Sequence, residues 1–162
     1  MANGLYQTEG IIFNSQDQGE ADKVLTIYTK EFGMLKLFAR GTRRSSSKLN
    51  KFLNLFTYGK FGFVSGKDSW HLIDAEDLGR FDKIYEPEFG RVSNFIKRFS
   101  PGEGEEPKLW DAFWDFTRTG DELLFYAKAL SILGYLDEKE IQTHSRENLA
   151  QLISGAIASS QL

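Results

Sequence analysis

The stretch KVLTIYTKEFGMLKLFAR, residues 23–40, decides the fold of the first half of this 162-residue chain. Lys23–Thr29 is rich in β-branched and aromatic residues, which favour strands. Glu31-Phe32-Gly33 predicts a turn, and strict alternation follows from Leu35 to Arg40. One face of this second strand carries Leu35, Leu37 and Ala39, and the other carries Lys36, Phe38 and Arg40. The stretch therefore predicts two strands, the second with an apolar face and a cationic, aromatic face.

Three more strands are expected around this pair. Gly10–Phe13 is a short apolar run that ends in a polar loop signal at Asn14–Gly19. Phe52–Val64 again has the composition of a strand. Its aromatic residues change from even to odd positions across Gly59, which a bulge near Gly59 would explain. After a turn at residues 66–68, Trp70–Ala75 completes the set. Five short strands separated by turns predict a small barrel.

The second half of the chain changes to helical periodicity, and the change near residues 78–85 marks the expected domain boundary. The expected helices run over Glu88–Phe99, from Pro107, over Asp121–Leu133 and from an N-cap at Ser145. The helix from Pro107 carries Trp110, Phe113, Trp114 and Phe116, a spacing typical of helical core, with a partner-peptide groove as the alternative. The sequence thus predicts an α+β protein with domains at 1–80 and 81–162.

Charge is distributed unevenly along the chain. Between Met34 and Lys67 there are eight basic residues and no Asp or Glu, although the whole chain has a net charge of −3. The basic residues are Lys36, Arg40, Arg43, Arg44, Lys48, Lys51, Lys60 and Lys67. Concentrated positive charge suits a polyanion, because each neutralised phosphate releases counterions.

Two features inside this segment indicate a nucleic-acid surface. The outward face of the alternating strand offers cation, aromatic and cation in Lys36, Phe38 and Arg40, so charge can follow a backbone while the ring stacks on a base. The loop from Arg40 to Lys48 offers four cations and four hydroxyls that suit phosphate. The alternatives are a solvated strand face covered by a helix, and a disordered surface loop.

Other chemistry finds little support in the sequence. The chain has no cysteine, which excludes disulfides, thiol nucleophiles and Cys-based zinc sites. The basic loop lacks P-loop spacing. The carboxylates of Gly19-Glu20-Ala21-Asp22 are expected to be solvated surface, and His71 is expected to point away from Asp74. We therefore expect no catalytic residue, no metal site and no cofactor. We also expect no signal peptide and no membrane span, which makes the cytoplasm the default location.

Four segments of the first 80 residues resemble the bacterial recombination mediator family RecO. Thr8–Phe13 resembles the family's first strand, and Gly19–Thr26 resembles its G-E-A/S-D-x-hydrophobic-hydrophobic-T stretch. Phe32-Gly33 leads into the third strand. Ala39–Lys48, followed by Phe56-Thr57 with Leu55 in place of the family's proline, resembles A-x-G-x-R-R-x-x-S-K/R … P-F-T. The helical half matches more loosely, through its acidic Gly/Pro loop and Ala129–Leu136.

The resemblance implies an N-terminal OB-fold barrel and a non-enzymatic factor of recombinational DNA repair, associated with the nucleoid. Members bind single- and double-stranded DNA, anneal complementary strands, and with RecR help to load RecA on DNA coated by single-strand DNA-binding protein (SSB). Family members commonly carry a four-cysteine zinc module after this region, and a chain without cysteine lacks it, so the helical domain is expected to be abridged. The expected DNA-binding residues are Lys36, Phe38, Arg40, Arg43, Arg44, Ser47, Lys48 and Lys51.

Alternative functions stay open at this level. The chain could be an interaction adaptor of the repair machinery, with RecR and SSB as partners and weak DNA contact, because its second half is acidic and aromatic. It could be a generic OB-fold RNA binder, because no residue is identified that reads a 2′-hydroxyl. An enzyme is the least supported class, since no nucleophile–base pair, metal cluster or phosphate loop is evident.

Overall fold

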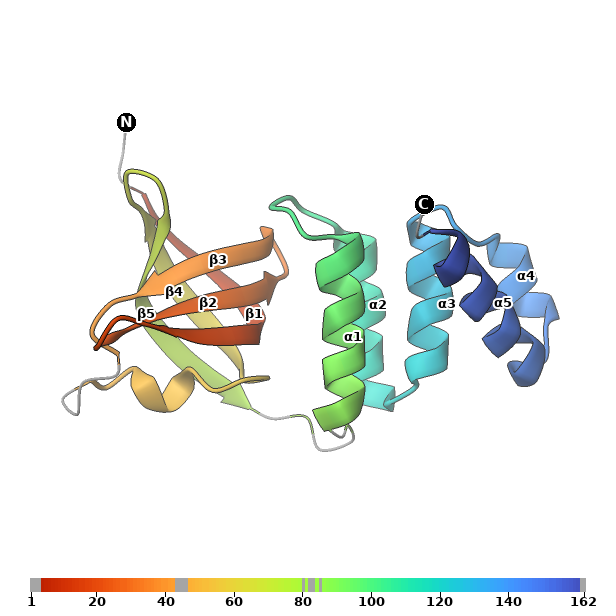
Figure 1. Ribbon diagram of the computed structural model, residues 1–162, viewed down its shortest axis with the longest axis horizontal. Helices are drawn as coiled ribbons and strands as arrows, with labels where there is room; N and C mark the ends of the chain where they lie inside the picture. The colour runs from red at the N-terminus through yellow and green to blue at the C-terminus, as the bar shows by residue number, and fades with distance from the viewer. Residues whose placement is uncertain (1–3, 43–46, 80, 82–83, 85, 161–162) are drawn as a thin grey trace. The chain divides into compact units, whose positions relative to one another are not determined.

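A closed five-stranded barrel precedes a set of helices in the computed structural model, which describes residues 4–42, 47–79, 81, 84 and 86–160 (Figure 1). The strands are β1 (Leu5–Gln18), β2 (Asp22–Thr29), β3 (Gly33–Ala39), β4 (Tyr58–Ser65) and β5 (Trp70–Gly79), and a 3₁₀ turn, η1 (Asn50–Phe52), lies between β3 and β4. Their order around the barrel is β1-β2-β3-β5-β4, and β4 pairs back with β1. The barrel is an OB-fold, and the predicted α+β class is confirmed.

The barrel is least extensively paired between β3 and β5. The pairs β1–β2, β1–β4, β2–β3 and β4–β5 are antiparallel and extensive. The parallel pair β3–β5 consists only of Leu37 opposite Trp70 and Phe38 opposite His71. The first half of β3 therefore has no partner on β5.

The barrel core follows the predicted alternation of β3. Leu35, Leu37 and Ala39 are each 1% exposed, and they pack with apolar side chains of the other strands, among them Phe61 and Phe63. Burial of such side chains is the main favourable term in folding. The inward face of β3 is thus fixed by the core, which forces Lys36, Phe38 and Arg40 outward.

Several predicted strand limits were wrong. β1 continues through the polar residues Asn14–Gln18, which pair with Asp22–Thr26 of β2 after a register shift beyond Ile12. The end of a strand that extends beyond the core can keep its backbone hydrogen bonds to a neighbouring strand although its side chains are all polar. The polar composition of Asn14–Gln18 therefore wrongly predicted a loop. Phe52–Thr57 is not a strand but η1 and turns. A register shift does lie between Tyr58 and Gly59, close to the expected bulge.

The helices are α1 (Glu86–Phe99), α2 (Pro107–Thr119), α3 (Glu122–Ile132), α4 (Glu138–Thr143) and α5 (Arg146–Ser159). The expected cap at Ser145 forms, because its side chain accepts from the N–H of Asn148. Asp121, expected as the first residue of its helix, is instead the N-cap of α3 and accepts from the N–H of Leu124. α4 was not predicted, since it is a six-residue helix with no buried residue. Trp110, Phe113 and Phe116 are at most 5% exposed, so the aromatic set is mainly core.

The chain divides into two compact units. One contains the barrel together with Phe89–Glu106, which includes most of α1 and the acidic loop that follows it. The other contains mainly α2 to α5. Within the first unit the ring of Phe89 stacks on that of Phe56, with centroids 5.1 Å apart, which attaches α1 to the segment before β4.

Candidate nucleic-acid interface

A groove runs along the outward face of β3. Lys36 and Arg40 are exposed and Phe38 between them is half-buried. The ring of Phe38 lies 6.0 Å from that of His71 on β5, at an interplanar angle of 42°. The register between β3 and β5 brings these two rings together, because Phe38 and His71 are direct partners. Phe38 therefore forms the floor of the groove, and one side of its ring is supported by His71.

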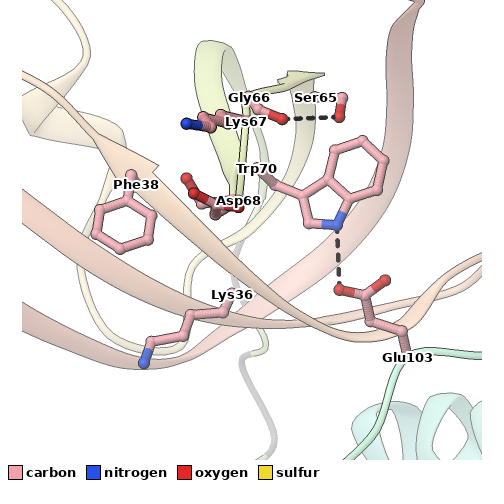
Figure 2. Close-up of a pocket in the computed structure, with 9 residues that line it drawn as sticks. Lys36, Phe38, Ser65, Gly66, Lys67, Asp68, Trp70 and Glu103 are labelled. Atoms are coloured by element: carbon pink, nitrogen blue, oxygen red, sulfur yellow. Dashed lines mark hydrogen bonds between the residues drawn. The ribbon is translucent and has the colours of Figure 1, made fainter.

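The opposite wall of the groove is the turn between β4 and β5. Gly66 donates its N–H to the carbonyl of Ser69 at 2.6 Å, which closes a tight turn with Lys67 and Asp68 at its tip. A hollow of about 290 Å³ lies between this turn and β3; Lys36, Phe38, Lys67, Trp70 and Glu103 are among its lining residues (Figure 2). Lys67 is not among the predicted DNA-binding residues, but the fold brings it to the groove.

A second hollow continues the groove past Phe38. It has a volume of about 520 Å³ and is lined by the β1–β2 turn as well as by β3 and the β4–β5 turn. Its lining residues are Gln18, Gly19, Asp22, Phe38, Arg40, Lys67, Asp68, Ser69 and His71. OB-folds bind oligonucleotides on this strand face and between these two turns. The groove thus has the location and the side chains that such a ligand requires.

The basic loop is anchored at its start. Gly41 has a φ of +65°, and its N–H donates to the Asp22 carboxylate at 2.7 Å. Thr42 is 1% exposed, and its hydroxyl donates to the carbonyl of Ala39 at 3.2 Å. These bonds fix the direction in which the chain leaves β3 beside Arg40. Asp22, expected to be solvated surface, therefore positions the start of the loop at Gly41.

The remaining predicted site residues belong to the basic loop and to η1. Arg43 and Arg44 lie outside the described residues. Ser47 is half-buried, and Lys48 and Lys51 are exposed. The ammonium of Lys51 lies 4.8 Å from the ring centre of Phe52, the next residue of η1. Phe52 packs against the barrel core.

Lys60 belongs to a different face of the barrel. It lies in register between Glu9 of β1 and Glu76 of β5, so two carboxylates flank it. Glu9 also accepts a hydrogen bond from the Tyr58 hydroxyl at 2.8 Å. Burial and this carboxylate together raise the pKa of Tyr58 to about 12. The segment that is free of acids in sequence is therefore not free of acids in space.

His71 is the groove residue that sequence reasoning missed. The prediction that it points away from Asp74 was wrong, because a register shift in β5 leaves Ile73 unpaired and both His71 and Asp74 face outward. Its Nε2 atom lies 3.2 Å from the Ser69 hydroxyl. The only signal in the sequence is that His71 follows a turn. This signal places His71 beside the basic strand only when the pairing of β3 with β5 is known.

Other chemistry has no visible site in the described part of the chain. No three His, Asp or Glu side chains in that part are grouped so that they could hold a metal ion. No helix within the described ranges is long and apolar enough to cross a membrane.

The barrel order defines this chain as an OB-fold protein, and one strand face of its barrel carries cations around an aromatic floor. Residues 1–81, half of the chain, match the family described as Recombination protein O N terminal. The chain belongs to this RecO family.

Curated relatives with the name DNA repair protein RecO support the assignment. The protein of Halalkalibacterium halodurans is 28% identical over 114 residues, which cover 67% of this chain and 45% of the relative. That of Thermoanaerobacter sp. strain X514 is 27% identical over 166 residues, which cover 90% of this chain and 65% of the relative. That of Bacillus cytotoxicus is 32% identical over 103 residues, which cover 63% and 42%. The chain thus spans about half the length of the curated relatives that it matches.

Proposed function

We propose that this chain is a non-enzymatic DNA-binding protein of recombinational repair, which holds single-stranded DNA in the groove on β3 and also contacts duplex DNA through its basic loop. The observation that carries the proposal is the outward row Lys36-Phe38-Arg40, which lines a groove between two turns of an OB-fold barrel. In this arrangement the cations follow the phosphates, and Phe38 stacks on a base.

The test is a fluorescence anisotropy titration with single-stranded DNA, duplex DNA and RNA at about 50 and 200 mM salt, a range in which phosphate contacts lose much of their affinity. If about five phosphates are contacted, log K against log salt has a slope of roughly −3 to −4 on single strands. Lys36→Ala combined with Arg40→Ala is expected to reduce this slope by about 1.4, since each lost phosphate contact contributes about 0.7.

Lys60→Ala provides the matched control. It removes the same charge from the same segment, but on the face where Glu9 and Glu76 flank the lysine. We expect its slope and affinity to stay close to those of the unmodified protein. A flat salt dependence of the unmodified protein would refute DNA binding by the groove, and so would equal losses in Lys60→Ala and the double variant. Preferential binding of RNA would favour a generic RNA binder instead.

Phe38→Ala separates stacking from charge. Base stacking on an aromatic ring contributes about 1–3 kcal/mol per base, so this variant is expected to weaken single-strand binding about fivefold or more at unchanged salt slope. An unchanged affinity for single strands would contradict the stacking role.

Strand annealing, loading of RecA, and association with RecR and SSB are proposed on the strength of the family. A mediator of this kind is expected in the cytoplasm, with the nucleoid. Pull-down with purified RecR and SSB tests the interaction with partners, and strong association combined with weak DNA binding would favour the adaptor function.

A further inference from the structure

The acidic loop after α1 is bound to the barrel beside the groove. We call residues 101–106 the acidic strap; its sequence is Pro-Gly-Glu-Gly-Glu-Glu. The carbonyl of Gly102 accepts from the N–H of Met34 at 3.2 Å, and the N–H of Gly104 donates to the carbonyl of Phe32 at 2.9 Å. Glu103 forms a β-bridge with Gly33, so the strap extends the sheet at the start of β3.

The approach of the strap depends on the absence of a side chain at Gly33. Gly33 has a φ of +68°, and a Cβ atom at this position would lie 2.3 Å from the carbonyl oxygen of Gly104. A real Cβ cannot come so close to a backbone atom. The strap is therefore seated on the barrel through backbone atoms at a fixed position.

The carboxylate of Glu103 is held as well. It accepts a hydrogen bond from the indole N–H of Trp70 at 3.0 Å (Figure 2). The Trp70 ring packs edge-on against Phe63, with centroids 5.3 Å apart, and against Tyr6, with centroids 5.4 Å apart. The rings hold the indole in place, and its hydrogen bond keeps the exposed carboxylate of Glu103 next to the hollow.

This charge lies at one end of the groove. Glu103 and Trp70 line the 290 Å³ hollow together with Lys36, Phe38 and Lys67. Among the described residues, no ion pair joins Glu103 to either lysine. The hollow therefore combines the cations of β3 and of the β4–β5 turn with two carboxylates, that of Asp68 beside Lys67 and that of Glu103 at the end next to the strap.

We propose that Glu103 is the end stop of the nucleic-acid groove. The inference rests on the proposed function and specifies the path of the strand. A phosphate that approached Trp70 would meet the like charge of Glu103, so the strand stays over Phe38 and continues toward Arg40 and the β1–β2 turn. At that end Asp22 and Asp68 also line the groove, but Arg40 and Lys67 line it beside them, and the Asp22 carboxylate accepts from Gly41. Glu103 thereby sets the length of strand that the groove accepts at this end.

The test compares Glu103→Gln with Glu105→Gln in the full chain. A glutamine at 103 still accepts from Trp70 Nε1, so only the charge is lost. Glu105 carries the same charge on the same strap, is exposed, and does not line the hollow. The assay is anisotropy with a length series of oligothymidines at low salt, and thermal unfolding checks that both variants are folded.

We expect Glu103→Gln to bind oligothymidine about three- to tenfold more tightly at low salt, where an exposed charge acts with little screening. The shortest oligonucleotide that reaches full affinity is expected to be longer than for the unmodified protein. Glu105→Gln is expected to stay within about twofold, since screening by water and salt weakens a charge farther from the strand.

Three results would overturn the inference while leaving DNA binding intact. They are unchanged affinity and length dependence in Glu103→Gln, an equal gain in Glu105→Gln, and an equal gain for a peptide nucleic acid of the same sequence, whose backbone carries no charge. Absence of DNA binding by the unmodified protein would instead refute the proposed function, and the end stop with it.

Discussion

Asp22 is expected to control the basic loop through a single hydrogen bond. Its carboxylate accepts from the N–H of Gly41 at 2.7 Å, at the residue where the chain turns out of β3 with a positive φ. A hydrogen bond to a charged group contributes about 1.5–3 kcal/mol. Asp22 is only half-buried, and water can replace part of the bond. We therefore expect Asp22→Ala to lower the free energy of unfolding by about 1 kcal/mol, below the range for a buried bond.

The effect on DNA binding needs a matched control, because Asp22 also lines the groove and its charge opposes phosphate. Asp22→Asn removes this charge but keeps an oxygen that can accept from Gly41. Asp22→Ala removes both. The difference between the two variants therefore isolates the anchoring of the loop.

Loss of the anchor means that binding must hold residues 40–42 at the end of β3 in place, at a cost of about 0.5–1.5 kcal/mol for each side chain immobilised. We expect Asp22→Ala to bind single-stranded DNA about three- to tenfold more weakly than Asp22→Asn, measured by anisotropy at one salt concentration. Urea unfolding of both variants measures the loss in the free energy of unfolding. Equal affinities of the two variants would refute the anchoring role, even if the stability loss were found.

Three further predictions concern stability. Gly33→Ala is expected to cost about 2–4 kcal/mol in urea unfolding, since it combines a strained positive φ with a clash against the acidic strap; Gly90→Ala, in a helix with open space around it, should instead stabilise by about 0.5–1 kcal/mol. Burial and Glu9 raise the pKa of Tyr58 from 10.0 to about 12, so the stability it contributes is present below pH 10 and is lost as the pH rises toward 12. Tyr58→Phe should flatten this alkaline loss in urea unfolding at a series of pH values, and an unchanged loss would contradict the assignment. Asp121→Ala removes the N-cap of α3 together with the ion pair to Arg146, and should lower the free energy of unfolding by about 1 kcal/mol in thermal unfolding. Asp121→Asn keeps a cap acceptor and loses only the exposed ion pair, so it should recover most of this loss.

Sequence reasoning recovered the elements whose local pattern and tertiary role agree. The alternation in Leu35–Arg40 predicted β3 and its two faces, because the side that is apolar in sequence is the side that the core buries. The cap at Ser145 was also found, since a cap is a local hydrogen bond between neighbours in sequence.

The failures have a common physical cause. Asn14–Gln18 forms strand because β2 supplies backbone partners, and these are invisible in the composition of the segment itself. The orientation of Asp74 depends on a register shift against β4, a property of two strands and not of one. Polar patterning predicts solvent exposure correctly in such segments, but it does not predict whether the backbone is paired.

The sequence by itself determined the strand that carries the candidate site. Lys36, Phe38 and Arg40 follow from a period of two, and the charge of the segment follows from counting residues. Tertiary structure alone decided which other side chains share the groove. Lys67 and His71 reach it because β3 and β5 pair in parallel, and Glu103, far along the chain, reaches it because Gly33 lets a backbone strap approach. Pairing and close approach are relations between distant segments, and a local pattern cannot encode where a distant segment will lie.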